Sequence, residues 1–523
     1  MTPDSLLQRI EASAQRHEKR CALSQAGARS LTYGELLARV RRAACSLTAL
    51  GLQPGDRVLF GVRPGVDAVV LLLAILRAGG VVATLDLGMG DETFAARRAL
   101  INPRWVIAAS ISYALSARAW PRRLLRARGV ALPPLARLTG VQLLRVGRRW
   151  PGVPRSIDAR ALWRADKSTA PCAPIVRRGP TDAAAIVCTS GTTGAPKAVV
   201  HSTASLEAMV DGIAAQLGLT EGDVVYAREM HLVIPALLAG ARVVIPPRRR
   251  PSPWRTLRLL GATQSTHASF VAGEAHALVA HCERRRARLP ATLRLMLLSS
   301  APAHPPFLAR LRRVMAEATR VLCVYGMTEI LPVATATLEE KLAFDEPGDL
   351  VGALVPGVHG RVADDGELHL RGPGLFTGYL GAPPSAEHAT GDVVRIDARG
   401  RIVLLGRKKD MIIRDGFNIY PELYEPTIEG VPGVRRCALV GWYDESAADE
   451  RVALVVEPTP GTDERALEHR LHDALRNGSG RIDEAALPDV IVFTSLPLAG
   501  RSSKIDKHAL RVQVQRRVAC ESR

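Results

Sequence analysis

The chain has 523 residues, of which 47% are hydrophobic and 23% charged, a balance that is ordinary for a globular enzyme with a sizeable core. Its formal net charge is +19, but the excess is mostly arginine spread along the chain, without the interleaved aromatic residues that stack on bases. We therefore expect no dedicated nucleic-acid-binding function.

The cysteines and the apolar runs indicate a cytoplasmic protein. Eight cysteines occur without a Cys-x-x-Cys pair, which is typical of reduced thiols. The N-terminal segment lacks a signal-peptide core. The most apolar run, Ala68–Leu76, is too short to span a bilayer, so we expect no transmembrane segment. His469 and His472 share one helical face, but without a third ligand at suitable spacing they favour a surface helix over a metal site.

The N-terminal part alternates helical and strand patterns. Apolar spacing predicts helices over Ser5–Arg16 and Gly34–Leu50, a strand over Arg57–Gly61, a crossover helix over Val66–Arg77 and a strand over Val81–Leu85. This alternation is the signature of a mainly parallel sheet covered by helices. The basic, proline-containing stretch that follows, residues 118–160, is weakly periodic and predicts an irregular surface region.

A loop rich in serine, threonine and glycine follows the apolar run Ala183–Val187, which predicts a buried strand. Its glycines permit a sharp turn, and its hydroxyls and lysine can converge on one anion. No Gly-Lys-Ser/Thr follows, so the Walker pattern is absent, and composition alone equally fits an exposed turn. The residues of this candidate phosphate loop are Thr189, Ser190, Gly191, Thr192, Thr193, Gly194 and Lys197.

Two later strands also end in small or polar residues. After a predicted helix over Ala204–Leu217 and a turn and strand over Leu237–Ile245, the strand Leu293–Leu298 leads into "SSAP" and the strand Val321–Tyr325 leads into "GMTE". Ligands of open α/β sheets lie at the carboxyl ends of strands, so these turns and the phosphate loop predict one shared site.

The character of the chain changes after Asp392. Two short strands flank a tight turn at residues 397–400, and a shorter α+β run follows, with elements predicted over residues 434–440, 451–457, 464–477 and 490–493. We therefore predict an N-terminal α/β domain over residues 1–406, a hinge over residues 407–410, and a small mobile α+β domain over residues 411–523.

Five segments in fixed order carry a resemblance that covers nearly the whole chain. They are the phosphate loop, "YGMTE" at Tyr325–Glu329, "TGDVV" at Thr390–Val394, "GRKKDMI" with "GFNIYP" from Gly406, and "GRSSKIDK" around Lys504. Together they resemble the acyl-adenylating (AMP-forming) superfamily of acyl-CoA synthetases, peptide-synthetase adenylation domains and luciferases. The resemblance implies that ATP converts a carboxylic acid into an acyl adenylate, with release of pyrophosphate. It also implies that the domain over residues 1–406 binds nucleotide and acyl group and that the small domain carries the catalytic lysine.

The resemblance also implies roles for individual residues. The phosphate loop would hold the β- and γ-phosphates, Thr328 would bind the α-phosphate, and Glu329 would help to hold Mg²⁺, which prefers oxygen ligands. Tyr325 would lie against adenine. Asp392 would accept hydrogen bonds from the ribose hydroxyls, and Arg407 would contact the same ribose-phosphate region.

Three further features concern catalysis and the second half-reaction. By resemblance, Lys504 would bridge the attacking carboxylate and the α-phosphate, and Lys409 would be the hinge of the small domain. The segment Gly416, Phe417 and Asn418 resembles the one that enters the site when a thioester forms. This resemblance favours coenzyme A as the acceptor, or the pantetheine arm of an acyl carrier protein. Thiols are partly ionised near neutral pH, so no strong dedicated base is required.

The acyl pocket is the least defined part of the sequence. Ser300 and Ala301 occupy the segment that resembles the family's adenylate contact. His231 lies in a segment shorter than the family's, and a plain surface histidine is an equal alternative. Apolar residues nearby favour a fatty or other hydrophobic acid, in keeping with fatty acid metabolism, although core packing explains them equally well. They are Met209, Leu232, Val233, Ile234 and Phe270.

Three alternatives to thioester formation by a coenzyme A ligase stay open. The stretches "LDLGMG" and "YGMTEILPVA" resemble the β-lactone synthetases of olefin biosynthesis, which activate a β-hydroxy acid. An enzyme that loads carrier proteins is a second alternative. A non-catalytic relative that binds a nucleotide without turnover is the third.

Overall fold

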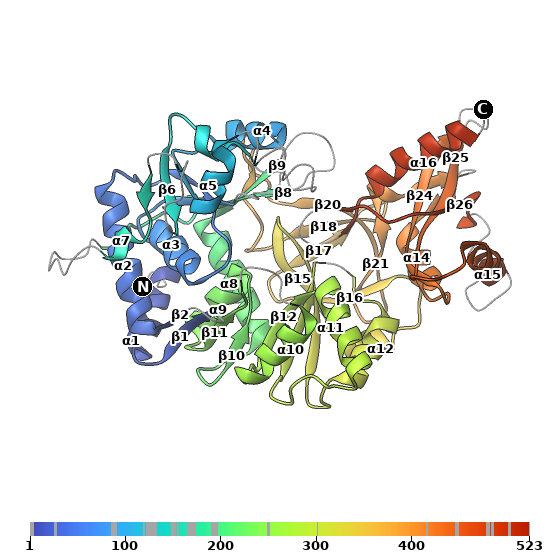
Figure 1. Ribbon diagram of the computed structural model, residues 1–523, viewed down its shortest axis with the longest axis horizontal. Coiled ribbons are helices and arrows are strands. Elements are labelled where there is room, and N and C mark those ends of the chain that lie inside the picture. Colours follow the sequence, from blue (N-terminus) through green and yellow to red (C-terminus); the bar gives the residue numbers. More distant parts are fainter. Residues whose placement is uncertain are drawn as a thin grey trace.

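Two large β-sheets and a smaller α+β unit make up the chain in the computed structural model (Figure 1). The model describes residues 5–25, 29–84, 91–118, 121, 133–147, 153, 156–164, 174–189, 197–247, 252–300, 302–414, 417–444, 449–476, 482, 486–499 and 504–521.

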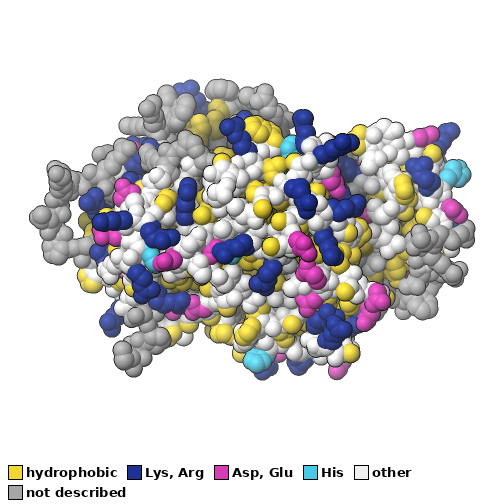
Figure 2. All heavy atoms as spheres, turned by 90° about the horizontal axis from the view of Figure 1, so that it is seen from below, with side chains coloured by type: hydrophobic (Ala, Val, Ile, Leu, Met, Phe, Trp, Pro, Cys, Tyr) yellow, Lys and Arg dark blue, Asp and Glu magenta, His cyan; other side chains and the backbone are white. Residues whose placement is uncertain are grey.

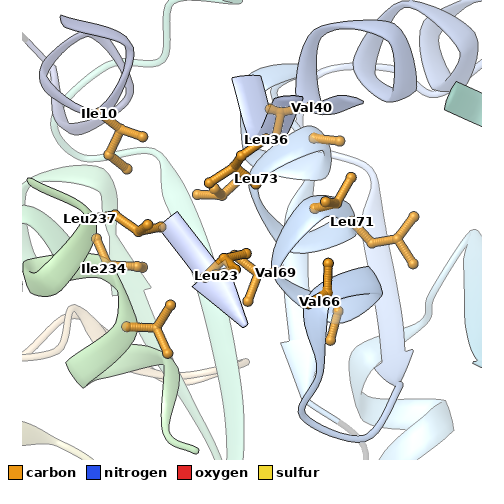
Figure 3. Close-up of a cluster of buried hydrophobic side chains, with 14 of the residues drawn as sticks. Ile10, Leu23, Leu36, Val40, Val66, Val69, Leu71, Leu73, Ile234 and Leu237 are labelled. Carbon is orange, nitrogen blue, oxygen red and sulfur yellow. The ribbon is translucent and has the colours of Figure 1, made fainter. Parts of the chain in front are cut away.

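The N-terminal helices begin where their sequence caps them. α1 (Leu6–Arg16) begins after Ser5 and α2 (Tyr33–Ala49) after Thr32, and each cap accepts the N–H three residues on in a capping box. α3 (Val66–Arg77) has the predicted bounds. Figure 3 shows these helices packed with β1 (Cys21–Gln25) and α9 (Met230–Leu238) around one apolar cluster that joins the two sheets.

The eight-stranded sheet carries the strands beside the phosphate loop. Its order is β19 (Gly378–Tyr379), β9 (Lys197–Ser202), β8 (Ala183–Thr189), β4 (Val81–Thr84), β3 (Arg57–Gly61), β5 (Trp105–Ala109), β6 (Gln142–Val146) and β7 (Ile157–Asp158). From β8 to β7 the pairings are parallel, as predicted, whereas β8, β9 and β19 pair antiparallel. The prediction of an irregular region over residues 118–160 was wrong for β6 and β7, which extend the parallel sheet.

The thirteen-stranded sheet joins a parallel part to an antiparallel part. Its order is β17 (His359–Val362), β18 (Glu367–Arg371), β20 (His388–Ile396), β21 (Ile402–Arg407), β16 (Asp349–Leu354), β15 (Ile330–Thr337), β14 (Arg320–Met327), β13 (Leu295–Ser299), β12 (His267–Val271), β10 (Val224–Tyr226), β11 (Arg242–Ile245), β1 and β2 (Arg29–Thr32). Strands from β14 to β1 are parallel, and those from β15 to β17 pair antiparallel.

Helices cover both sheets. The remaining ones before residue 400 are α4 (Asp91–Ile101), α5 (Ser110–Ala117), η1 (Leu135–Arg137), α7 (Ala161–Arg164), α8 (Thr203–Leu217), α10 (Pro253–Ala262), α11 (Ala272–Arg285), α12 (Pro305–Val314) and α13 (Leu338–Leu342). α9 occupies the short segment before β11, so residue 237, where a turn was predicted to begin, still belongs to a helix. In the described part of the chain, no helix is long and apolar enough to cross a membrane.

The C-terminal unit has its own core and lies at one end of the molecule (Figure 1). It contains η2 (Lys408–Asp410), β22 (Ile412–Arg414), β23 (Phe417–Ile419), α14 (Pro421–Glu429), β24 (Val434–Asp444), β25 (Asp449–Pro458), α15 (Glu464–Arg476), β26 (Val490–Phe493), β27 (Leu498–Ala499), β28 (Lys504–Ile505) and α16 (Lys507–Glu521). The predicted hinge falls on η2, and a mobile domain after it stays a prediction.

Charge and metal-ligating groups are dispersed in the described residues. On the face in Figure 2, lysine and arginine side chains are scattered among acidic and hydrophobic ones. The described cysteines are free thiols. His469 and His472 are exposed on α15, and the described residues contain no cluster of three or more His, Cys, Asp or Glu side chains that could hold a metal ion.

Candidate functional site

The candidate site lies where parallel strands of the large sheet end. β13 and β14 are paired neighbours, so Ser300 and Thr328, just beyond their carboxyl ends, lie on the same edge. From the other sheet, β9 begins at Lys197, whose side chain is exposed. In the phosphate loop, residues 190–196 lie outside the described residues, and Thr189 is described only as backbone in β8.

Tyr325, Asp392 and Arg407 form one contact group. The Tyr325 hydroxyl donates to Asp392 Oδ2 over 2.6 Å, and Arg407 Nε lies 2.8 Å from Asp392 Oδ1. Asp392 is fully buried, and burial together with this carboxylate raises the pKa of Tyr325. The Arg407 contact lacks hydrogen-bond alignment, so among the described residues Oδ1 has no hydrogen-bond donor. A buried carboxylate oxygen of this kind fits a ribose hydroxyl, which would supply the donor.

The turn Thr328–Glu329 is held by contacts from a distant part of the sequence. His201 Nε2 lies 2.8 Å from the Thr328 carbonyl oxygen, and the Phe376 N–H donates to the Glu329 carbonyl oxygen over 2.7 Å. The Tyr379 hydroxyl donates to Glu329 Oε1 over 2.9 Å. Glu329 thus presents a fixed, half-buried carboxylate. One carboxylate together with phosphate oxygens is a donor set that suits Mg²⁺.

His201 and Tyr379 are site residues that the sequence prediction missed. Tyr379 also lies beneath the ammonium group of Lys197, which is 5.0 Å from the centre of its ring. His388 belongs to the same surroundings. Burial lowers its pKa and Lys197 lowers it further, while Glu329 raises it. The only sequence signal for His201 is its place four residues after Lys197 in β9.

Lys504 shares the electrostatic surroundings of the contact group. Its side chain is exposed at the end of β27–β28, yet desolvation by nearby protein atoms lowers its pKa, and the cation Arg407 lowers it further while Asp392 raises it. Just beyond it, Lys507 is nearly buried, with Nζ 2.8 Å from Glu425 Oε1. The base of α16 is therefore anchored to α14, which fixes the strand that carries Lys504.

The predicted hinge is tied to the large sheet. Lys408 Nζ lies 2.6 Å from Asp365 Oδ2 and 2.7 Å from Glu367 Oε2. Glu367 also accepts the Gly391 N–H over 2.7 Å, next to Asp392. On the small-domain side, the Lys409 carbonyl oxygen accepts from Arg511 Nη1 over 3.1 Å.

The residues assigned to the acyl pocket have mixed outcomes. His231 is half-buried in the first turn of α9 rather than on the open surface, and burial lowers its pKa. Ser300 is exposed with φ 71°, a left-handed backbone that costs a non-glycine residue about 1–2 kcal/mol. Ala301 and Gly416 lie outside the described residues, and Phe417 and Asn418 are described only as backbone in β23.

Residues expected to line the acyl pocket instead belong to cores. Leu232, Val233 and Ile234 are buried in the cluster of Figure 3, whereas Phe270 is buried in a separate cluster with α11 and α12. Core packing therefore accounts for their apolar character, and they give no information about the acid.

A protein-family model described as AMP-binding enzyme matches residues 10–380. Isonitrile lipopeptide synthase from Streptomyces coeruleorubidus is 30% identical over 92% of this chain, which spans 32% of that protein. A 2-hydroxy-7-methoxy-5-methyl-1-naphthoate–CoA ligase from Streptomyces carzinostaticus is 28% identical, covering 93% of this chain and 89% of its own. Olefin beta-lactone synthetase from Stenotrophomonas maltophilia is 29% identical, covering 92% and 91%. ATP-bound MatB from Rhodopseudomonas palustris has a TM-score of 0.77 at 25% identity, covering 98% and 99%.

Proposed function

The chain belongs to the AMP-binding enzyme family and is an adenylate-forming ligase that activates a carboxylic acid. We propose that this acid is fatty or otherwise hydrophobic and that coenzyme A is the acceptor of the acyl group. The observation that carries the proposal is the ion pair of the buried Asp392 carboxylate with Arg407, two groups whose charges also act on the pKa of Lys504. The buried carboxylate suits a ribose, and we assign Lys504 to the point where the two anions approach each other.

In the first half-reaction, an oxygen of the substrate carboxylate attacks the α-phosphorus of ATP. A bond forms between them, the bond from the α-phosphorus to the bridging oxygen of the β-phosphate breaks, and pyrophosphate leaves with that electron pair. Both reactants are anions, so fixed cations and oriented donors lower the barrier. We assign the α-phosphate to Thr328, and the β- and γ-phosphates to the phosphate loop and Lys197.

Lys504 supplies the positive charge where the two anions meet. Desolvation and the cation Arg407 lower its pKa, and Asp392 opposes that shift. Bound phosphate and substrate carboxylate would also oppose the lowering of the pKa of Lys504, because negative charge favours the ammonium form. Mg²⁺, held by Glu329 and phosphate oxygens, would neutralise charge on the departing pyrophosphate.

In the second half-reaction, the sulfur of coenzyme A attacks the acyl carbon and AMP leaves with the electrons of the carbon–oxygen bond. The thiol proton is lost to solvent, since thiols ionise near neutral pH without a strong base. Coenzyme A is supported by the "GFNIYP" segment after the hinge and by a relative named as a CoA ligase. That relative's name also gives an aromatic acid, which supports a hydrophobic body for the substrate.

A β-lactone synthetase is the second candidate, because one relative carries that name at 29% identity. In that reaction, the β-hydroxyl oxygen of the bound adenylate attacks its own acyl carbon and loses its proton to solvent. AMP leaves with the electrons of the broken carbon–oxygen bond, and no thiol takes part. An enzyme that loads a carrier protein differs from the main proposal only in the source of the thiol.

Pyrophosphate exchange separates these functions. We expect exchange with fatty or aryl acids, and thioester formation when coenzyme A is added to the acid that exchanges best. If a thioester forms only with a pantetheine-loaded carrier protein, that protein and not coenzyme A is the acceptor. AMP release from a β-hydroxy acid without thiol would establish the lactone reaction. Exchange with no acid, despite ATP binding, would contradict the proposed function.

A further inference from the structure

The Thr328–Glu329 turn belongs to the large sheet, but residues of the smaller one hold it. β9 and β19 pair antiparallel, with Tyr379 opposite Val199 and Gly378 opposite Val200. His201 follows on β9, so both side chains that reach the turn start from this strand pair. The strand that leaves the phosphate loop therefore contacts the residues assigned to the α-phosphate and Mg²⁺.

His201 is fixed on both sides of its ring. Its side chain is buried, Nε2 faces the Thr328 carbonyl oxygen at 2.8 Å, and Nδ1 faces the Ser205 hydroxyl at 3.2 Å. A carbonyl oxygen can only accept, so Nε2 carries the hydrogen and Nδ1 accepts from Ser205. Burial lowers the pKa of His201, which favours this neutral form. The imidazole thus acts as a rigid donor to one backbone atom.

Tyr379 contacts both charges of the proposed phosphate site. Its ring lies under the Lys197 ammonium group at 5.0 Å, and its hydroxyl donates to Glu329 Oε1 over 2.9 Å. Phe376 packs edge-on against Tyr379, with ring centres 5.0 Å apart, and limits the rotation of that ring. Tyr379 therefore orients one oxygen of Glu329 and also contacts the ammonium group of Lys197.

We propose that His201 and Tyr379 are positioning residues for adenylation, which lock the Thr328–Glu329 turn and Lys197 into one unit. His201 sets the backbone of Thr328, so that its polar groups meet the α-phosphate. Tyr379 holds the carboxylate of Glu329 through its hydroxyl and the ammonium group of Lys197 over its ring. This inference rests on the proposed function, since it takes its nucleotide contacts from there.

Paired substitutions test the two residues. Tyr379→Phe removes only the hydroxyl, and we expect the Mg²⁺ concentration needed for half-maximal ATP binding to rise about 10- to 100-fold, measured by titration calorimetry. Tyr379→Leu should in addition weaken ATP binding at saturating Mg²⁺, because the ring under Lys197 is lost. His201→Ala should lower kcat of pyrophosphate exchange about tenfold with a smaller change in the KM for ATP, and His201→Gln, which keeps an N–H donor, should recover part of it.

Tyr113→Phe is the control, since it too removes a hydrogen-bonded tyrosine hydroxyl, one that donates to the carbonyl oxygens of Val106 in β5 and Leu144 in β6 and does not contact the turn. It should lower the melting temperature without changing the Mg²⁺ requirement. A wild-type Mg²⁺ requirement in Tyr379→Phe would overturn the role of Tyr379. Equal kinetics of His201→Ala and His201→Gln would overturn that of His201.

The readouts keep this inference distinguishable from the proposed function. If wild-type protein binds ATP but exchanges pyrophosphate with no acid, the function fails, while the calorimetric comparison of Tyr379→Phe with Tyr113→Phe still decides the role of Tyr379. If exchange is normal in wild type, and also in the position-379 variants at limiting Mg²⁺ and in the position-201 variants, the function stands and this inference fails. A wild-type protein that does not bind ATP would contradict both.

Discussion

Replacing Asp392 by Asn tests the ribose assignment and the ion pair separately. The carboxylate is fully buried, with Tyr325 donating to one oxygen and Arg407 Nε lying 2.8 Å from the other. Asn keeps the shape and an acceptor for the Tyr325 hydroxyl. It removes the negative charge, and an amide N–H₂ then faces the Arg407 guanidinium or the ribose position, where an acceptor is needed.

The magnitude follows from this geometry. Two unit charges 2.8 Å apart attract by about 6 kcal/mol at an effective dielectric constant of ~20. The Arg407 side chain is 40% exposed, so solvent screens its attraction to Asp392. We therefore expect the free energy of unfolding to fall by about 2–3 kcal/mol, less than the loss of a fully buried pair would cost. A hydrogen bond to a charged group contributes about 1.5–3 kcal/mol, so ATP should bind roughly 10- to 150-fold more weakly.

Two assays read the two effects. Denaturant unfolding of Asp392→Asn, Arg407→Gln and the double variant gives the coupling free energy of the ion pair. Calorimetric titration compares ATP with 2′,3′-dideoxy-ATP, and the loss in Asp392→Asn should be confined to ATP, because the dideoxy analogue offers no hydroxyl donor. An equal loss for both nucleotides would refute the ribose contact. A coupling free energy near zero would refute a stabilising role for the Asp392–Arg407 pair.

Other substitutions test the remaining groups. Lys504→Ala should lower pyrophosphate exchange by on the order of 10²-fold while ATP binding stays close to wild type, and near-normal exchange would contradict its assignment. Lys507→Met should cost about 2–3 kcal/mol in denaturant unfolding, because the half-buried Glu425 loses its cation. Lys408→Met should cost less, because the Lys408 side chain is 42% exposed and solvent screens its pairs with Asp365 and Glu367. Ser300→Gly should raise stability by up to about 1 kcal/mol, since relief of the left-handed backbone exceeds the entropy cost of glycine, and a lower midpoint would contradict that strain. The folded-state pKa of His201 is below its ordinary value of 6.5, so below about pH 6.5 the unfolded chain binds a proton that the folded chain does not. The free energy of unfolding should therefore fall as pH drops below about 6.5. His201→Gln should flatten this dependence in melting curves recorded at a series of pH values.

Local signals in the sequence predicted the covering helices well. Ser5 and Thr32 are caps with glutamine or glutamate three residues on, and α1 and α2 begin directly after them. α3 was predicted from its apolar spacing between two strands and has its expected bounds. Strands β6 and β7 were missed because they lie near the edge of the sheet, with the half-exposed residues of Gln142–Val146 giving little apolar contrast. Edge strands depend on pairing with a neighbour, which a local pattern does not contain.

The candidate site was predictable only where its residues sit in a motif. Tyr325, Asp392 and Arg407 were named from three separate segments, and the structure joins them through distances of 2.6 and 2.8 Å. The apolar residues of α9 were ambiguous, because a continuous apolar run does not distinguish a core from a pocket, and they belong to the core.

His201 and Tyr379 could not be predicted for a different reason. They act on Thr328 and Glu329 only because β9 pairs with β19, a contact between strands about 180 residues apart in the chain. Neither side chain carries an unusual local pattern, and each reaches the other sheet through a single polar atom. A motif identifies the residues expected to contact the nucleotide. Which other residues hold them in place depends on the strand pairing of the folded structure. The turn after β14 should therefore be sensitive to substitutions in β9 and β19 that leave every motif residue intact.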